Sequence, residues 1–344
     1  MPSTSLPPNV LLIRLSAIGD IVMASGLPSS IKRAMPNAKV TWLIEPAYAD
    51  MVRHHSQVDE VICWPKSTWQ KLASKKRYFA LLKAIWHFRS ELRAQGFTLA
   101  IDAQGLLKSA FLAWLSGAKE RIGFVSKEHS HALLTHAIDK PVSTMISSEY
   151  RALAKWLGTS DYVLDIQISY NANQNALASL QRLNITSPYI ALAPFTTRPQ
   201  KHWPLAHWLS LINELRKLTS APIAVLGGPG DECEAQALSF SESDVHCLAG
   251  HTSLPESIAI IKHCAVLIGV DTGLTHIGTA FSIPTVALFG STCPYTETDS
   301  PYTQVLYRNL ACAPCRRKPT CKGAYSCMRE IEPTHVISAI RGYL

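Results

Sequence analysis

The sequence has no long uninterrupted hydrophobic run and no basic leader segment. Its first ten residues carry three prolines and neither lysine nor arginine, and the apolar run that follows is interrupted by Arg14 and Asp20. A signal peptide begins with basic residues ahead of an apolar stretch, and a membrane-spanning helix needs roughly 20 apolar residues. Neither pattern fits, so we expect a cytoplasmic protein.

The sequence has fewer acidic than basic residues. It also lacks the glycine-rich pattern of dinucleotide-binding proteins. The chain has 25 Asp and Glu against 33 Lys and Arg, a net charge of +8. This excess favours a polyanionic partner, which leaves nucleic acid, an anionic membrane surface and phosphorylated substrates open. Neither Ser16–Asp20 nor Gly227–Gly230 supplies the G-x-G-x-x-G pattern. A dehydrogenase is therefore disfavoured.

Short apolar runs alternate with longer amphipathic stretches, which is typical of βα units on a parallel sheet. The 344 residues, 47% of them hydrophobic, are enough for two ordinary cores. A stretch rich in polar and turn residues, 169–188, separates two such series. We therefore expect an α/β protein of two similar halves, residues 1–172 and 173–344, whose ligands lie beyond the carboxyl ends of the strands.

The elements of each half follow from the same alternation. The first half is predicted to have a long helix from about Thr68 to Gln95, another helix after Gly105, and strands at Val10–Leu15, Val40–Ile44, Glu60–Cys63 and Leu99–Asp102. The second half is predicted to have strands at Tyr189–Ala193, Ile223–Gly227, Ala265–Val270 and Thr285–Phe289, and helices at Pro204–Leu218, Asp231–Phe240 and Leu254–His263.

The segment Leu267–His276 is typical of a buried strand that runs into the first turn of a helix. Unpaired N–H groups and the helix dipole stabilise an anion at such a point, and phosphate is the obvious candidate. Asp271 repels phosphate unless it faces other groups, such as sugar hydroxyls, while Gly273 lets the backbone approach closely and His276 lies one turn further on. The combination indicates a phosphorylated sugar. The alternative is a well-capped helix with Asp271 or Thr272 as its N-cap.

A second motif, Ser16-Ala17-Ile18-Gly19-Asp20, follows the first predicted strand. A carboxylate at Asp20 could accept the proton of an attacking hydroxyl, as an inverting displacement at a sugar carbon requires. An aspartate that merely caps the helix is the alternative.

The loop 196–204 combines hydroxyls with positive charge. Thr196, Thr197, Arg198 and Lys201 offer the donors and charge that a diphosphate leaving group needs, and Lys201 is the predicted phosphate ligand. The alternative is a solvated basic loop. Glu232, after the turn at residues 227–230, could accept a ribose hydroxyl or could be an ordinary acid in a first helical turn.

Four segments occur in one order between about Asn9 and Thr292: Ser-x-x-Gly-Asp at 16–20, Asp-Ala-Gln-Gly-Leu-Leu-Lys-Ser-Ala at 102–110, Thr-Thr-Arg-x-x-Lys-His-Trp-Pro at 196–204 and Asp-Thr-Gly-Leu-Thr-His at 271–276. Together they resemble the ADP-heptose:lipopolysaccharide heptosyltransferases of glycosyltransferase family 9. Within that family, they are most similar to the heptosyltransferase I type. The resemblance implies a GT-B fold of two Rossmann-like domains that face each other across a cleft. The first domain would bind the acceptor and the second the nucleotide sugar.

The resemblance also implies an activity and roles for residues. The expected reaction is a metal-independent, inverting transfer of heptose from ADP-heptose to the Kdo sugar of the lipid A core. Asp20 matches the catalytic base, Lys201 the phosphate ligand and Glu232 the ribose contact. The segment that contains Thr252 lies where the family contacts adenine through its backbone. The residues that match the surroundings of the donor heptose and phosphates are Asp271, Thr272, Gly273 and His276.

The first half also carries a stretch in which basic and aromatic residues alternate. Its cations are Lys66, Lys71, Lys75, Lys76, Arg77, Lys83, Arg89 and Arg93, and its aromatic residues are Trp64, Trp69, Tyr78, Phe79, Trp86 and Phe88. Such a stretch suits an anionic membrane surface, although a solvated helix face would look similar. Lys108, Arg121 and Lys127 are further candidates for contacts with an acidic acceptor.

Four cysteines near the C-terminus follow the pattern Cys312-x2-Cys315-x5-Cys321-x5-Cys327. They could close a structural zinc site, although the second pair lacks the Cys-x2-Cys spacing. The alternative is a tail of reduced thiols packed on the second domain. No zinc is expected in catalysis, because no histidine or carboxylate belongs to the group.

The sequence thus predicts a heptosyltransferase at the inner face of the cytoplasmic membrane of a Gram-negative bacterium. A related transferase of the heptosyltransferase II type, with another core acceptor, is the nearest alternative. Two other classes stay open: a basic, cysteine-containing nucleic-acid-binding protein, and a nucleotide-sugar sensor without catalysis. The carboxylates of Asp20, Glu232 and Asp271 oppose a phosphate backbone, so nucleic acid is not the expected partner.

Overall fold

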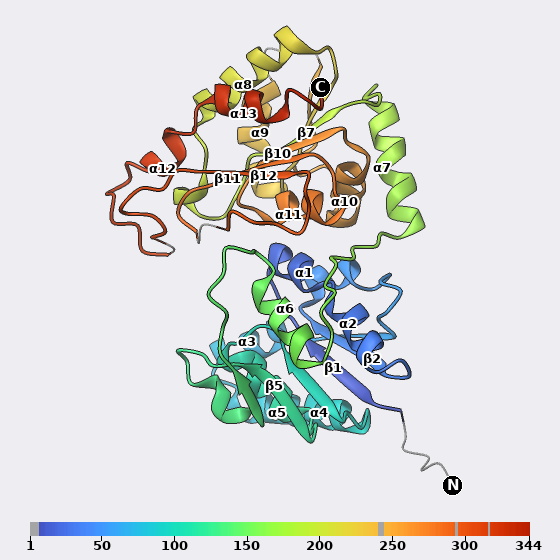
Figure 1. Cartoon of the computed structure of the whole chain (residues 1–344). Coiled ribbons are helices and arrows are strands. Elements are labelled where there is room, and N and C mark those ends of the chain that lie inside the picture. The colour runs from blue at the N-terminus through green and yellow to red at the C-terminus, as the bar shows by residue number, and fades with distance from the viewer. Residues whose placement is uncertain (1–6, 240–243, 293–294, 316) are drawn as a thin grey trace. The chain divides into compact units, whose positions relative to one another are not determined.

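The computed structural model describes residues 7–239, 244–292, 295–315 and 317–344 (Figure 1). Phe240, the predicted end of one helix, lies outside these residues. The chain divides into two compact units: unit 1 contains Met1–Val142 and Ser147–Gln167, and unit 2 contains Ser143–Ile146 and Ile168–Leu344. The boundary predicted between residues 172 and 173 falls inside a helix of unit 2, Tyr170–Arg182, and the main segment of unit 2 starts at Ile168, five residues earlier than expected.

Unit 1 is built on a six-stranded parallel sheet in the order β3-β2-β1-β4-β5-β6. Its strands are β1 (Asn9–Ile13), β2 (Lys39–Ile44), β3 (Glu60–Cys63), β4 (Leu99–Asp102), β5 (Glu120–Phe124) and β6 (His136–Ile138). Val10 lies beside Val40 on one side and Leu99 on the other, so β1 is fully interior. This strand order is that of the Rossmann fold.

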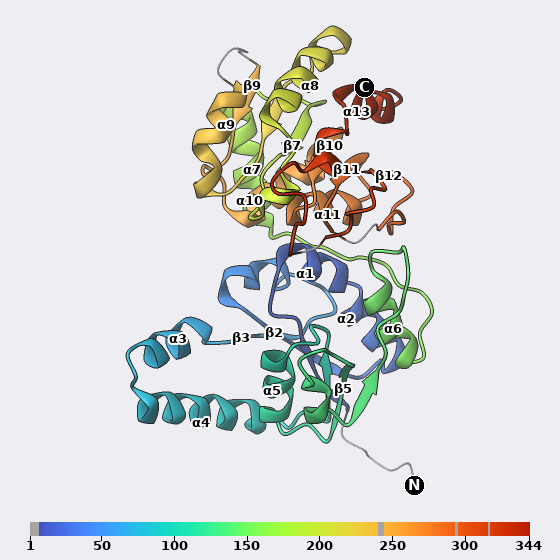
Figure 2. The ribbon, with the colours of Figure 1, turned by 90° about the vertical axis from the view of Figure 1, so that its left-hand side faces the viewer.

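The helices of unit 1 are α1 (Ile18–Ala24), α2 (Leu27–Ala34), α3 (Lys66–Ser74), α4 (Tyr78–Ala94), α5 (Leu107–Leu115) and α6 (Ser148–Trp156). The single helix predicted from Thr68 to Gln95 is wrong, because it is two helices separated by a turn at residues 75–77. Lys76 in that turn has φ of +53°, a left-handed conformation that no continuous helix allows. Figure 2 places α3 and α4 side by side, with the turn at their far end.

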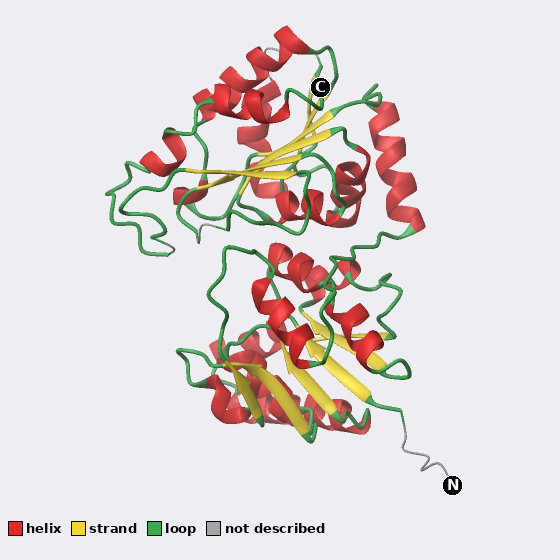
Figure 3. Ribbon diagram, in the orientation of Figure 1, coloured by secondary structure: helices red, strands yellow, loops and turns green. Residues whose placement is uncertain are grey.

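Unit 2 repeats the architecture, with a parallel sheet in the order β12-β11-β10-β7-β8-β9. Its strands are β7 (Ile190–Ala193), β8 (Ile223–Val225), β9 (Val245–Cys247), β10 (Val266–Val270), β11 (Thr285–Phe289) and β12 (Thr303–Tyr307). Its helices are α7 (Tyr170–Arg182), α8 (Leu205–Leu218), α9 (Glu232–Ser239), α10 (Leu254–His263), α11 (Gly273–Ala280), α12 (Ser326–Arg329) and α13 (Pro333–Ile340). Helices cover both faces of this sheet (Figure 3). The predicted α/β class with two Rossmann-like sheets is confirmed.

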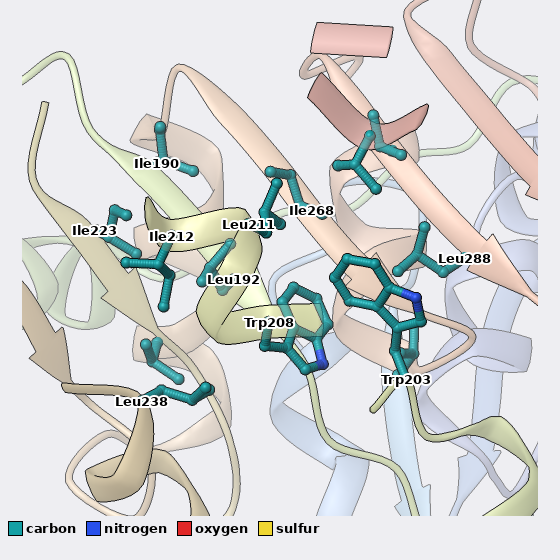
Figure 4. Packing of buried hydrophobic residues seen from close by; sticks show 14 of the residues in the cluster. Ile190, Leu192, Trp203, Trp208, Leu211, Ile212, Ile223, Leu238, Ile268 and Leu288 are labelled. Carbon is teal, nitrogen blue, oxygen red and sulfur yellow. The ribbon is translucent and has the colours of Figure 1, made fainter. Parts of the chain in front are cut away.

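The core of unit 2 lies between its sheet and the helices α8 and α13 (Figure 4). Trp203 and Trp208 meet edge to face with 4.8 Å between ring centroids, and the indole N–H of Trp203 donates to the carbonyl of Ile331 at 2.7 Å. Each large apolar side chain buried in this way contributes about 1.5–3 kcal/mol. The loop that follows β7 is therefore anchored at Trp203, two residues after Lys201.

In the described part of the chain, every helix is too short or too polar to cross a membrane.

Candidate active site

At the carboxyl edge of the unit 1 sheet, Arg14 and Asp20 form an ion pair. Arg14 follows β1 and is buried, and its guanidinium also donates to the carbonyl of Ala103, after β4, at 2.9 Å. β1 and β4 are neighbours at the point where the strand order reverses, which is why the two loops meet. The Oδ2 atom of Asp20 accepts the Arg14 contact and a 3.4 Å hydrogen bond from the N–H of Ala17, while the side chain stays 54% exposed.

The surroundings of Arg14 keep it charged. Burial by itself would lower the pKa of Arg14, but Tyr150, Asp20 and Glu149 outweigh burial and raise it. The cation also lies 5.8 Å from the ring centroid of Tyr150. Asp20 is therefore exposed to solvent on one side and forms an ion pair with a buried positive charge on the other.

Asp102 and Gln104 fix the loop that closes β4. Asp102 Oδ1 accepts the N–H groups of Gln104 and Gly105, both at 3.0 Å, and Gln104 Oε1 accepts the N–H of Leu15 at 2.9 Å. Burial raises the pKa of Asp102, although these N–H groups and Ser109 act in the other direction. The predicted motif Asp102–Ala110 thus contacts the loop that carries Arg14 through the carbonyl of Ala103 and the side chain of Gln104.

Two of the three predicted acceptor contacts lie at this edge. Lys108 is in the first turn of α5, with Nζ 3.6 Å from Glu45 Oε1, and Lys127 is exposed in the loop after β5. Arg121 does not belong with them. It lies near the amino end of β5, and its guanidinium donates to the carbonyls of Leu133 and Ala118.

In unit 2, the structure joins two residues that the sequence assigned to different parts of a ligand. Lys201 Nζ lies 2.6 Å from Asp271 Oδ2, and both side chains are at most 14% exposed. Lys201 follows β7 and Asp271 follows β10, which are neighbours at the reversal of strand order in this sheet. The predicted loop residues Thr196 and Thr197 lie after the same strand, with the carbonyl of Thr196 2.7 Å from His202 Nε2.

Asp271 is the centre of this cluster. His276 Nε2 lies 3.5 Å from its Oδ1, and the hydroxyl of Thr292 donates to its Oδ2. Burial would raise the pKa of Asp271, but the hydrogen bond from His276 and the charge of Lys201 outweigh burial and hold it well below the ordinary aspartate value. Asp271 is therefore a fixed anion that orients Lys201.

Helix α11 begins beside this pair. Thr272 is the N-cap residue, its side chain makes no capping hydrogen bond, and Gly273 is the first helical residue. The helix packs tightly on the sheet: a Cβ atom on Gly278 would approach Leu267 Cδ2 and Thr285 Oγ1 to 2.5 Å. The N–H groups of the first turn are thereby held in place with no helical partner.

The remaining predicted donor residues follow the next strands of the same edge. Glu232, at the start of α9, places Oε1 3.3 Å from His251 Nε2, and its side chain is 43% exposed. The hydroxyl of Thr252 lies 2.8 Å from that of Ser257, so it is engaged within the protein. All of the predicted donor residues of unit 2 therefore lie after β7, β8, β9 or β10, at one edge of the sheet.

The cysteine tail brings its thiols into mutual electrostatic contact. Burial, and then the neighbouring thiols of Cys315, Cys312 and Cys321, raise the pKa of Cys327. Within the described ranges, however, no three His, Cys, Asp or Glu side chains are arranged to hold a metal ion.

Two residues that the structure connects to the candidate site, Arg14 and Thr292, were not predicted from the sequence. Arg14 ends an otherwise apolar run, and this lone buried cation is a signal that could have been used. Thr292 lies 21 positions from Asp271 in the chain, and no periodic pattern links them.

Comparisons with known proteins place these features in a family. A family model described as "Glycosyltransferase family 9 (heptosyltransferase)" matches residues 85–326. Lipopolysaccharide heptosyltransferase 1 of Pseudomonas aeruginosa is 28% identical over 333 residues, which cover 91% of this chain and 87% of that protein.

Solved structures show the same fold. A glycosyl transferase family 9 protein from Veillonella parvula has a TM-score of 0.85 at 20% identity and covers 99% of this chain and 98% of its own. The E. coli heptosyltransferase WaaC with ADP-2-deoxy-2-fluoro heptose has a TM-score of 0.71 at 25% identity, and the match covers 98% of this chain and all of that one (100%). The expected GT-B class with two Rossmann-like domains is confirmed.

Proposed function

Because this chain belongs to glycosyltransferase family 9, the heptosyltransferase family, we propose that it transfers heptose from ADP-heptose to the Kdo sugar of the lipopolysaccharide inner core. The observation that carries the proposal is the buried Lys201–Asp271 pair beside the start of α11. A fixed cation next to free N–H groups suits the diphosphate of a nucleotide sugar. The chain is a glycosyltransferase. What we propose is the identity of its donor, ADP-heptose, and of its acceptor, the Kdo sugar.

The donor is held by residues of unit 2. Lys201, the hydroxyls of Thr196 and Thr197, and the first N–H groups of α11 at Thr272 and Gly273 bind the diphosphate. Asp271 and His276 face the heptose, Glu232 accepts a ribose hydroxyl, and the backbone around Thr252 contacts adenine. Asp271 has a second role, because its charge keeps Lys201 in one position.

Asp20 is the base. As the acceptor hydroxyl attacks the anomeric carbon from the face opposite ADP, its oxygen forms the new bond and its proton passes to the Asp20 carboxylate. The bond between the anomeric carbon and the diphosphate breaks, and its electron pair leaves with ADP, so the configuration inverts. Proton acceptance of this kind contributes about 10²–10⁴-fold to the rate. Arg14 holds one carboxylate oxygen and leaves the other side of the group open to solvent.

The acceptor is an acidic glycolipid, and Lys108 and Lys127 at the unit 1 edge supply charges for it. Such an acceptor would place the enzyme at the inner face of the cytoplasmic membrane of a Gram-negative bacterium. A heptosyltransferase II type, acting on a core that already carries heptose, is the alternative that the same residues allow. The nucleic-acid-binding reading has no support in the family match.

Metal enters the proposal only as a structural group. Lys201 and the start of α11 supply the positive charge that a divalent ion provides in other transferases, so the reaction itself needs no metal. We propose that Cys312, Cys315, Cys321 and Cys327 take up one zinc ion after their thiols draw together. Metal analysis of the intact protein, with Cys321→Ser as the comparison, tests this. The proposal is overturned if the unaltered protein contains no zinc and the Cys321→Ser variant is as stable as the unaltered protein.

The first experiment is ADP release from ADP-heptose with Kdo-lipid A as acceptor, in buffer that contains a chelator. We expect acceptor-dependent release that collapses in Asp20→Asn, whereas Asp139→Asn, an exposed aspartate of the same unit, keeps it. Release only with an acceptor that already carries heptose would assign the second type. Failure to bind the donor would overturn the proposal.

A further inference from the structure

Helix α4 presents two apolar faces, of which only one is covered. Phe88 and Leu92 are buried in the unit 1 core, and Leu81 packs against it. On another face, the aromatic and aliphatic side chains lie open to solvent: Tyr78 is 62% exposed, Phe79 85%, Leu82 57% and Trp86 62%. The spacing 78, 82, 86 places three of them in one row along the helix.

The structure divides the aromatic residues of this stretch into two groups. Trp64, Trp69 and Phe88 pack edge to face, with centroid distances of 5.9 and 5.7 Å, and form part of the core. Tyr78, Phe79 and Trp86 have no place in it. Large apolar side chains gathered on one exposed face usually mark a surface that meets a partner.

Positive charge surrounds the exposed row. Arg89 lies over the Trp86 ring at 4.6 Å, and the turn before α4 adds three exposed cations, Lys75, Lys76 and Arg77. Further cations on the helix are Lys83 and Arg93. Among the residues that the structure describes, none of these six has a carboxylate within salt-bridge distance, and the acid of the helix, Glu91, pairs with His87 at 3.2 Å.

We propose that this face, defined by Tyr78, Phe79, Leu82 and Trp86 with the cations around it, docks on an anionic phospholipid bilayer and inserts its apolar side chains among the headgroups. The inference rests on the proposed function, since a glycolipid acceptor requires the enzyme at a membrane. A second copy of the chain suits the face less well, because an isologous contact would bring two sets of unpaired cations together. An anionic bilayer satisfies the charges and the apolar row at once.

Vesicle sedimentation of the intact protein tests the proposal, with neither donor nor acceptor present. We expect binding to vesicles of phosphatidylethanolamine and phosphatidylglycerol that weakens with salt, and far weaker binding to phosphatidylcholine alone. Phe79→Ser with Trp86→Ser should lower the partition on the order of tenfold or more. Tyr170→Ser, which alters an aromatic residue 76% exposed on unit 2, should leave it unchanged. Lys75→Glu should also weaken binding, and Lys155→Glu, at an exposed position on α6, should not.

Three results would overturn the proposal: equal binding to both kinds of vesicle, unchanged binding by the Phe79 and Trp86 variant, or a dimer of the free protein that this variant abolishes. The last would assign the face to a second copy. ADP release with a deacylated, water-soluble Kdo acceptor separates this inference from the proposed function. The α4 variants should keep that activity. If the unaltered protein has no activity with the soluble acceptor, the transferase proposal fails, whereas the vesicle result is unaffected.

Discussion

Arg14 supports Asp20 from within the protein: the side chain of Arg14 is 7% exposed, whereas the side chain of Asp20, with which it forms an ion pair, is 54% exposed. The same guanidinium donates to the carbonyl of Ala103, so the position of Asp20 depends on the ends of both β1 and β4. Arg14 is itself buried. It is a positioning residue for the proposed base.

Arg14→Met should therefore lower kcat by roughly 10²-fold, because a displaced base loses its alignment with the attacking hydroxyl. KM for the donor should change little, since the donor residues lie in unit 2. Arg14→Lys keeps the charge and should recover part of the loss. Steady-state kinetics with both substrates varied would measure the split between kcat and KM. A rise in donor KM with kcat intact would contradict the assignment.

Acid should destabilise the protein partly through Asp271. Its pKa is lowered in the folded state, so its charge contributes stability above the ordinary aspartate pKa of about 4, and this contribution is lost as the pH falls toward the lowered value. Asp271→Asn leaves the buried Lys201 unpaired and should cost about 3–5 kcal/mol near neutral pH. Urea unfolding at several pH values should show this difference from the unaltered protein narrowing below about pH 4.

Asp139→Asn is the matched control, because Asp139 is exposed. Its unfolding free energy should follow that of the unaltered protein at every pH. An Asp271→Asn penalty that does not change with pH would mean that the buried charge is not the source of the stability.

The sequence predicted eight of the strands that the structure describes and missed β5, β6, β9 and β12. The predicted strand at Thr285–Phe289 matches β11 residue for residue, because a buried parallel strand is a compact apolar run. By contrast, β6 at His136–Ile138 and β12 at Thr303–Tyr307 were missed. Both are edge strands with partly exposed residues, so the apolar signal is weak there.

The candidate site divides in the same way. Asp20, Lys201 and Asp271 could be predicted because each follows a recognisable strand, and the carboxyl ends of parallel strands share one edge. The pairing of Lys201 with Asp271 could not be predicted, because it depends on which strands are neighbours in the sheet. Local periodicity in the sequence does not reveal the strand order. The place of Arg121 near the amino end of β5 could not be predicted either, because the sequence did not predict β5 as a strand.

Lys201 and Asp271 should behave as a coupled pair in stability but not in donor binding. Lys201→Met should weaken ADP binding about 10- to 100-fold, the worth of a charge-assisted hydrogen bond, and should also destabilise the fold by leaving Asp271 unpaired. The double variant Lys201→Met with Asp271→Asn removes both charges. We expect it to regain stability without regaining affinity for ADP.

Calorimetric titration with ADP and urea unfolding of the four proteins would measure both couplings. If the double variant regains affinity for ADP, Lys201 does not bind the diphosphate. The weaker ADP binding of Lys201→Met would then have come from the unpaired carboxylate of Asp271 alone.

Glu232→Gln should weaken ADP binding about fivefold, close to the value of one hydrogen bond, with little change in stability because the side chain is 43% exposed. Glu234→Gln, at an exposed position two residues further on, should have no effect and serves as the control. Binding of 2′-deoxy-ADP and 3′-deoxy-ADP then identifies the contact. If Glu232 accepts a ribose hydroxyl, its substitution costs nothing with the analogue that lacks that hydroxyl, whereas an equal loss with ADP and both analogues would show that Glu232 acts through the loop at His251 instead.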